Sequence, residues 1–170
     1  MKRDRNPFRT LRREPALKPA VADSYRPEAK LADPTLCKEC GATFRNGRWT
    51  WQKAPTGAHV HRCPACQRIH DRFPAGFVVL KAKFDAARRA QLLDLIAARE
   101  AREKAEHPMQ RIIAIEDVAG AIQVTTTDTH LASAIAHAVR DAFHGTLEIA
   151  YSRDEALVRA VWRPAAAQGT

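Results

Sequence analysis

The residues of this chain whose types and spacing could do chemistry are its four cysteines, which form two Cys-x-x-Cys pairs. A Cys-x-x-Cys turn supplies two thiolates from one tight loop, and four thiolates at about 2.3 Å complete the tetrahedral coordination of a structural Zn²⁺. The 22 residues between the pairs slightly exceed the usual spacing of about 15–20, which leaves room for a hairpin. We therefore predict that zinc is a cofactor, bound by Cys37, Cys40, Cys63 and Cys66.

The same cysteines could instead form disulfides or a redox pair. The start Met1–Arg5 is charged and is followed by prolines rather than by an apolar signal segment, so we expect a cytoplasmic protein, in which disulfides are rare. A redox pair needs a β-α-β setting, and none surrounds Cys37. His59, His61 and His70 lie near the second pair, but four cysteines leave no ligand position for them.

Positive charge is concentrated in the first half of the chain. The formal net charge is +9, from 28 Lys and Arg against 19 Asp and Glu. Residues 36–75 carry seven basic against two acidic side chains, whereas residues 107–170 carry five against seven. This pattern predicts a nucleic-acid-binding module attached to a more neutral unit. No apolar run approaches the ~20 residues that cross a bilayer, so we expect no membrane partner.

Residues 1–35 are predicted to form a disordered basic tail. They contain five prolines, nine basic and five acidic side chains, and no apolar periodicity. Such a segment cannot bury enough apolar surface to offset the entropy lost on ordering. The tail is either an inert terminus or an arm that orders along RNA.

Residues 36–75 are predicted to form a zinc ribbon around a hairpin at Asn46-Gly47, because both central residues of a type I′ turn need positive φ. Pairing outward from the turn places Phe44 opposite Trp49 on an apolar face that covers the metal. Arg45 then lies opposite Arg48 on a basic outer face, which is either a solvated turn or a phosphate contact. The candidate nucleic-acid-binding residues are Arg45, Arg48, Lys53, Arg62, Arg68 and Arg72.

Residues 76–106 are predicted to form a strand over 76–83 and a connecting helix. The helix has Asp85 as its N-cap and stops before His107-Pro108. Beyond Arg99 the helix is charged all round, so its far half projects into solvent or reaches the next unit.

Residues 107–165 are predicted to form a ββαββ domain. Asp128 is a good N-cap for the helix, and Gly145 suits the position after its end. The whole chain is therefore α+β: a disordered basic tail, a four-cysteine zinc ribbon, a helix and a ββαββ unit. One face of the sheet is covered by the domain's own helix, and the other is solvated or covered by the helix that follows Asp85.

We find no positive evidence of catalysis in the sequence. It contains no Walker loop, no G-x-S-x-G elbow, no H-E-x-x-H and no dinucleotide fingerprint, and every cysteine is assigned to the metal. We therefore expect no enzymatic activity and no small-molecule substrate. His130, His137 and His144 recur at seven-residue spacing on one helix face, which is either a solvated polar face or a contact face for RNA or protein.

Short motifs spread over residues 36–163 carry a family resemblance. They are Cys37-x-x-Cys40-Gly41, Gly47-Arg48-Trp49, Cys63-Pro64-x-Cys66, Arg68-Ile69, Pro74-Ala75-Gly76, His107-Pro108 and Thr126-Thr127-Asp128-x-His130-Leu131-Ala132. With them the chain resembles an uncharacterised family of short bacterial zinc-ribbon proteins. More distantly, the order of parts is similar to the N-terminal half of the eukaryotic and archaeal adaptor that escorts the large ribosomal subunit. The chain departs from that adaptor in lacking its additional zinc pairs, its later barrel-like domain and its export signal.

The resemblance to the adaptor implies binding to the ribosome or to ribosomal RNA. Together with the basic ribbon, it leads us to expect a non-enzymatic zinc-ribbon protein that acts in the assembly, inactivation or storage of ribosomes under stress. The alternative is a protein–protein adaptor or regulatory module in which zinc is purely structural. Salt dependence separates the two, because phosphate contacts lose affinity steeply between ~50 and ~200 mM salt.

Overall fold

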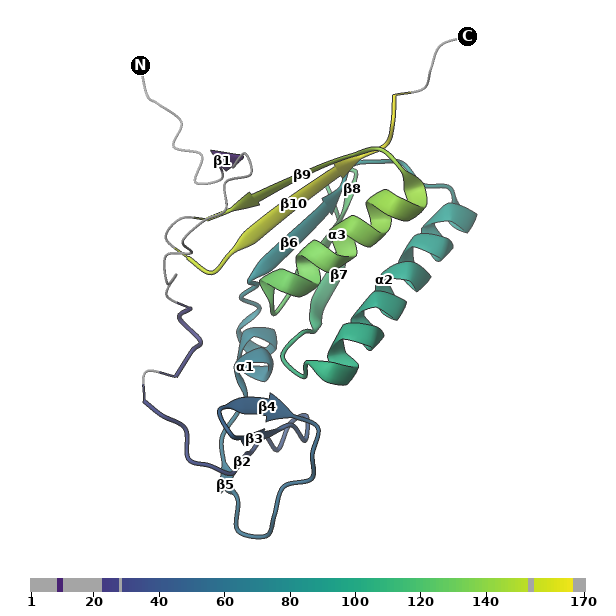
Figure 1. Ribbon diagram of the computed structural model, residues 1–170. Coiled ribbons are helices and arrows are strands. Elements are labelled where there is room, and N and C mark those ends of the chain that lie inside the picture. Colours follow the sequence, from purple (N-terminus) through teal and green to yellow (C-terminus); the bar gives the residue numbers. More distant parts are fainter. Residues whose placement is uncertain (1–8, 11–22, 28, 153–154, 167–170) are drawn as a thin grey trace, which may run out of the picture.

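The computed structural model describes residues 9–10, 23–27, 29–152 and 155–166. They form a small four-stranded sheet near the start of the chain and a larger six-stranded sheet covered by two long helices. We call residues 35–75 the ribbon module and residues 76–163 the sheet module. The ribbon module lies at one end of the sheet module (Figure 1). Within the described residues, no helix has the length and apolar character that crossing a membrane requires.

The ribbon module contains the predicted hairpin. Asn46 and Gly47 have φ values of 51° and 82°, and the register places Phe44 opposite Trp49 and Arg45 opposite Arg48, as predicted. Two further short strands, which the sequence did not indicate, extend the hairpin to a sheet with the order β4-β3-β2-β5. The strands are β2 (Thr35–Leu36), β3 (Thr43–Arg45), β4 (Arg48–Thr50) and β5 (His59–Val60).

A short helix, α1 (Pro64–Asp71), follows the ribbon strands and leads into β6 (Gly76–Leu80). The next helix, α2 (Ala86–Glu106), begins and ends as predicted. The Asp85 carboxylate accepts a hydrogen bond from the Arg88 backbone N–H at 2.8 Å, which satisfies one of the free donors of the first turn.

The predicted ββαββ order is confirmed by the elements that follow α2. In α3 the Asp128 carboxylate caps the first turn, accepting from the backbone N–H groups of His130 and Leu131 at 2.8 and 3.1 Å. The helix has the buried apolar stripe that its sequence period predicts. These elements are β7 (Ile112–Val118), β8 (Ala121–Thr126), α3 (Thr129–Phe143), β9 (Thr146–Tyr151) and β10 (Val158–Arg163).

The predicted domain boundary between residues 106 and 107 does not separate the strands of the large sheet. Its order is β1-β9-β10-β6-β8-β7, with β1 (Arg9–Thr10) at the edge beside β9. Strand β6 therefore lies at the centre, antiparallel to β8 and parallel to β10. The chain from β6 to β9 has the order of a split β-α-β fold, with β10 inserted between β9 and β6. Residues 76–163 thus share one sheet.

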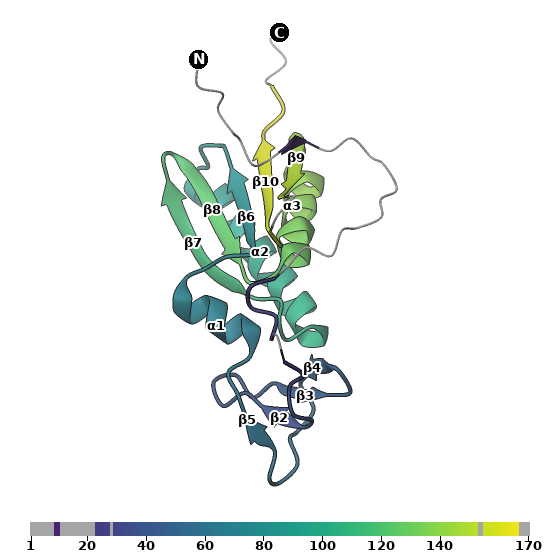
Figure 2. The same ribbon diagram turned by 90° about the vertical axis from the view of Figure 1, so that its left-hand side faces the viewer.

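Helices α2 and α3 pack side by side on the same face of this sheet (Figures 1 and 2). The second of the two predicted arrangements, with α2 on the opposite face, is therefore wrong; no described helix covers that face, which we call the open face. Leu92 and Ile96, which belong to the apolar patch of α2, are fully buried in the core that α2 shares with α3. The patch therefore packs against α3 and not against the far side of the sheet. The core is made of Val78, Leu80, Leu92, Ile96, Ile122, Val124, Leu131, Ala132, Ile135, Ala136, Val139, Val158, Ala160 and Trp162.

Most of the predicted tail, residues 1–8, 11–22 and 28, lies outside the described residues. The described part includes a short strap, residues 23–27, that packs on α1. The hydroxyl of Tyr25 donates to Asp71 Oδ2 at 3.0 Å, and its ring lies 5.7 Å from that of Phe73. The composition of the tail did not indicate these contacts.

Candidate metal centre

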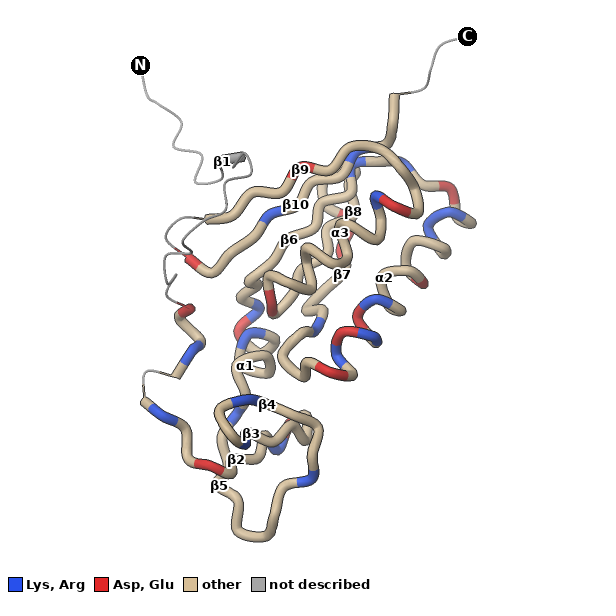
Figure 3. The backbone as a smooth tube through the Cα atoms, in the orientation of Figure 1, with Lys and Arg blue, Asp and Glu red and all other residues tan. Residues whose placement is uncertain are grey.

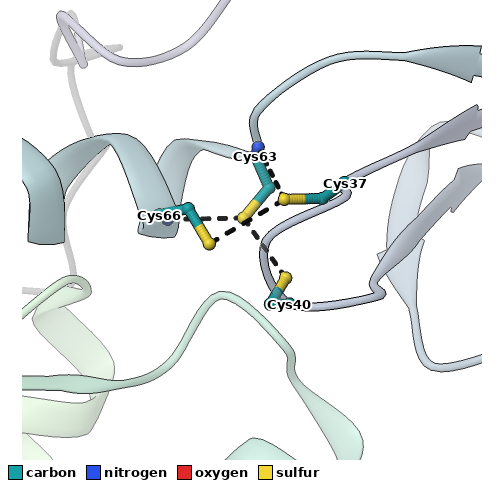
Figure 4. A group of neighbouring side chains, drawn as sticks. All are labelled: Cys37, Cys40, Cys63 and Cys66. Atoms are coloured by element: carbon teal, nitrogen blue, oxygen red, sulfur yellow. Dashed lines mark hydrogen bonds between the residues drawn. The ribbon is translucent and has the colours of Figure 1, made fainter.

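The four cysteine side chains converge at the junction of the ribbon module with the sheet module (Figure 4). All four Sγ atoms lie within 4.8 Å of one another. The Sγ atoms of Cys37 and Cys66 are 3.8 Å apart, as are those of Cys40 and Cys63. Four sulfurs at about 2.3 Å from a central Zn²⁺ form a tetrahedron with edges of about 3.8 Å. Two opposite edges thus have the length that a bound zinc ion requires, and the cysteines are free thiols rather than disulfides.

The first pair of ligands lies in a tight turn that follows β2. The backbone N–H of Gly41 donates to the Cys37 carbonyl at 2.8 Å, and the Cys37 N–H donates to the Ala42 carbonyl at 2.9 Å. The turn requires φ of 81° at Gly41, a conformation that glycine adopts without steric cost. This explains why the glycine directly follows Cys40.

The second pair lies at the start of α1. Cys63 is the N-cap and Pro64 occupies the first turn, where its missing N–H costs nothing. The backbone N–H of Cys66 donates to Cys63 Sγ at 3.3 Å, and the N–H of Cys63 donates to Cys37 Sγ at 3.4 Å. Backbone donors and the positive end of the helix therefore stabilise negative charge on these sulfurs.

A fifth side chain, from the sheet module, completes the site. Arg111 precedes β7, is only 7 % exposed, and donates from Nη2 to Cys63 Sγ at 3.2 Å and to Cys66 Sγ at 3.3 Å. Its backbone N–H donates to Thr127 Oγ1 at 2.9 Å. A buried cation beside two of the sulfurs would offset part of the double negative charge that four thiolates around a divalent ion carry. Sequence reasoning missed Arg111, because nothing around it indicates that it contacts a ligand.

The pKa values show how far these thiols depend on compensating charge. Burial raises the pKa of Cys63 well above its usual range, and it raises the pKa of Cys66 to about 11 although Arg111 acts in the opposite direction. Burial would also raise the pKa of Cys37, but backbone N–H groups, led by that of Cys63, lower it to about 7. For Arg111, burial lowers the pKa, but the Cys66 and Cys63 sulfurs outweigh it and raise it. A divalent cation among the four sulfurs would supply the missing positive charge.

Apolar side chains from both modules surround the sulfurs. Trp49, on the apolar face of the hairpin, packs on the cysteine cluster together with Met109 of the sheet module. A further link joins the modules, because Trp51 Nε1 donates to the Lys104 carbonyl of α2 at 2.6 Å. The donor set, the sulfur spacing and the apolar neighbours therefore fit a closed structural metal site.

Four of the predicted nucleic-acid-binding residues are exposed, namely Arg45, Arg48, Lys53 and Arg72. Figure 3 shows basic residues along the ribbon strands and α1. Arg62 is half-buried and pairs with the Glu39 carboxylate. These exposed basic residues thus all lie on the ribbon module.

Arg68 is a correction to the predicted surface, because its side chain is buried. The residue is 4 % exposed, and its guanidinium donates to Asp23 Oδ1 at 2.7 Å and to the Phe73 carbonyl at 3.0 Å. The Tyr25 ring covers it, with the guanidinium carbon 4.3 Å from the ring centroid. Arg68 holds the strap on α1 and cannot reach a phosphate without breaking these contacts.

The histidines with seven-residue spacing form no metal cluster. His130 is exposed and lies 3.5 Å from the Asp128 carboxylate, and His137 is half-buried. His144 lies beyond the end of α3 with φ of 58°, off the helical face. Among the described residues, the four cysteines are the only group of three or more His, Cys, Asp or Glu side chains close enough to share an ion.

Comparisons of the chain with models of protein families, with curated proteins and with solved structures gave no match.

Proposed function

We propose that this chain is a non-enzymatic zinc-ribbon protein that binds ribosomal RNA on the ribosome, in the cytoplasm. The observation that carries the proposal is the pair of exposed arginines, Arg45 and Arg48, directly opposed at the tip of a hairpin beside the metal centre. A factor for the assembly, inactivation or storage of ribosomes needs such a binding surface and no catalytic site.

The identity of the metal is part of this proposal. Zinc is the ion that four thiolates in tetrahedral array select most often, and it has no redox chemistry of its own. The sulfur separations of 3.8 Å support zinc. With all four positions taken by cysteines, the ion would hold the ribbon module together and would bind no substrate.

The hairpin favours a phosphate partner over plain solvation. Two like charges directly opposite on an antiparallel pair repel each other, and no carboxylate in the described part of the chain forms an ion pair with Arg45 or Arg48. A phosphate between the two guanidinium groups would remove that repulsion. Because the metal fixes the hairpin, little conformational entropy would be lost on binding.

A protein–protein adaptor remains the second candidate, and one observation favours it. Strand β5 is at the edge of the small sheet, and its Val60 is 55 % exposed. An exposed edge with an apolar side chain can pair with a strand of another protein.

The test is the double charge reversal Arg45→Glu with Arg48→Glu, assayed by sedimentation with ribosomes at about 50 and 200 mM salt. Each lost phosphate contact reduces the salt slope by about one unit and weakens binding to all RNA sequences alike. We expect the variant to be released at low salt with its zinc content unchanged. A matched control reverses Arg88 and Arg102, two exposed arginines of α2, and should still sediment. Sedimentation of the hairpin variant at wild-type levels would overturn the proposal and favour the adaptor.

A further inference from the structure

The open face of the large sheet carries a hollow at the end farthest from the ribbon module. Its lining comes from the central strands of the sheet, the segment after β6 and the turn that joins β7 to β8, and its volume is about 590 Å³. This size is within the range of small-ligand sites, roughly 300–1,000 Å³. Its lining includes Lys81, Lys83, Arg159, Gln123, Val79 and Val118.

The hollow is lined by basic residues, although Glu116 lies next to it, directly opposite Gln123 on β7. Three of its lining residues are cationic, and none of the lining residues is acidic. Lys81 and Lys83 are exposed, and neither forms an ion pair with a carboxylate of the described residues. Other basic side chains of this module do pair with carboxylates, unlike these two lysines: Arg89 pairs with Asp117 at 2.9 Å, and Arg163 pairs with Glu148 at 3.3 Å. The hollow is therefore a place where an anion would be stabilised.

The rest of the lining suits a flat, polar-edged group rather than a bare anion. Val79 is 8 % exposed and belongs to the central strand, and Val118 at the rim is 44 % exposed. Between them Gln123 offers an amide, which can donate and accept hydrogen bonds. The guanidinium carbon of Arg159 lies 5.3 Å from the centroid of the Phe77 ring, so the ring braces this cation on the sheet. The turn residue Gly120 has open space where a Cβ would be.

We infer that this hollow binds one nucleotide of a single-stranded RNA. Lys81 and Lys83 hold its phosphate, the valines contact the base, and Gln123 reads the base edge. Unpaired bases are the parts of RNA that proteins stack and hydrogen-bond, whereas a duplex hides them. The inference rests on the proposed function in that the ligand is RNA, but it assigns a second contact site on a different module.

The test uses the full zinc-loaded chain and a fluorescent twelve-nucleotide oligouridine as the probe. Lys81→Glu with Lys83→Glu removes both cations that hold the phosphate, so we expect an affinity loss of about tenfold or more and a salt slope lower by about one unit. Gln123→Leu keeps the charge and volume but removes the amide, and it should weaken binding by about fivefold. The reversal of Arg88 and Arg102 on α2 is the matched control and should bind as the wild type does.

Further arms of the experiment separate this site from the hairpin and from other ligands. If the lysine and glutamine variants both bind the oligonucleotide normally while the Arg45 and Arg48 reversal abolishes binding, the hollow is overturned and the proposed function stands. If the wild type fails to bind the probe although it sediments with ribosomes, the hollow is likewise overturned. The inference would also be contradicted if uridine monophosphate or an RNA duplex bound at the same lysines as tightly as the oligouridine does, or more tightly. Zinc content and circular dichroism confirm that each variant is folded.

Discussion

Different interactions stabilise the ribbon module and the sheet module. In the ribbon module the buried cluster consists of three cysteines and one alanine, with Trp49 and Met109 packed against it. In the sheet module fourteen buried residues form a continuous apolar core. Apolar burial stabilises the second by roughly 25 cal/mol per Å², but the first has too little apolar surface for that. We therefore expect the stability of the ribbon module to depend on a bound metal ion and that of the sheet module to depend on packing.

Arg111 links the sheet module to the cysteine cluster of the ribbon module. It belongs to the sheet module by its backbone and to the metal centre by its guanidinium. Ordering the sheet therefore places a cation beside the thiolates. The following changes would break or sharpen the contrast between the modules, beginning with the largest expected effect.

Cys63→Ser should unfold the ribbon module and leave the sheet module folded. Metal binding is worth about 10–16 kcal/mol in finger-sized peptides, and it is lost when one thiolate is removed. We expect one zinc per wild-type chain by elemental analysis and none in the variant. NMR spectra should lose the dispersed signals of residues 35–75 only. A chelator should have the same effect on the wild type, and a metal-free chain with unchanged spectra would refute the metal's role.

Leu131→Ala should do the reverse, destabilising the sheet module while zinc stays bound. Leu131 is fully buried between α3 and the sheet, and truncating a buried leucine costs about 2–5 kcal/mol. Urea unfolding followed by circular dichroism would measure the loss. His130→Ala, at the exposed neighbouring position, is the control and should change stability by less than about 0.5 kcal/mol. Release of zinc at the same urea concentration as sheet unfolding would mean that the modules unfold together.

Arg111→Met should weaken zinc binding by about 10- to 100-fold, the usual effect of removing a partner of metal ligands. The methionine fills a similar volume but leaves the thiolates without their cation. Arg111→Lys keeps the charge and should recover part of the affinity. Competition with a chromophoric chelator would give both values. Unchanged affinity in the methionine variant would show that backbone donors alone balance the sulfurs.

Gly47→Ala should have the smallest effect, about 1 kcal/mol, and only on the ribbon module. A side chain at φ of 82° is strained, whereas a Cβ there would meet no neighbour within 4 Å. The melting temperature of the zinc-bound ribbon should fall slightly with no change in the sheet. Asn46→Gly, at the other positive-φ position of the turn, should be neutral within error, and a large loss there would point to a role for the Asn46 side chain.

The features that could be predicted from sequence are those set by neighbouring residues. The hairpin register could be predicted from Asn46-Gly47, and the starts of two helices from Asp85 and Asp128. Each of these signals acts within a few residues. The convergence of the four cysteines also followed from their spacing, since two Cys-x-x-Cys turns at this distance are typical of one structural metal site.

The features that could not be predicted depend on residues far apart in the chain. The pairing of Gly76 with Val158 in parallel strands has no local signal, because either strand alone fits several sheet orders. Arg68 and Arg111 are each buried against partners more than forty residues away, yet in the sequence they are indistinguishable from the exposed Arg48. Whether a charged side chain is buried depends on the whole fold. The local sequence therefore led us to predict Arg68 on the surface, which is wrong.

The place of β10 inside the sheet has a consequence for the nascent chain. All four cysteines emerge from the ribosome long before Val158–Arg163, so the ribbon module can take up its metal early in synthesis. Strand β6 emerges next, but one of its two edges stays unpaired until β10 is made. During that interval the core face of β6 and an open strand edge are available for wrong contacts. We therefore expect chains interrupted before residue 158 to bind metal, although more weakly because the incomplete sheet does not hold Arg111 in place, and to be recognised by chaperones and proteases as unfinished.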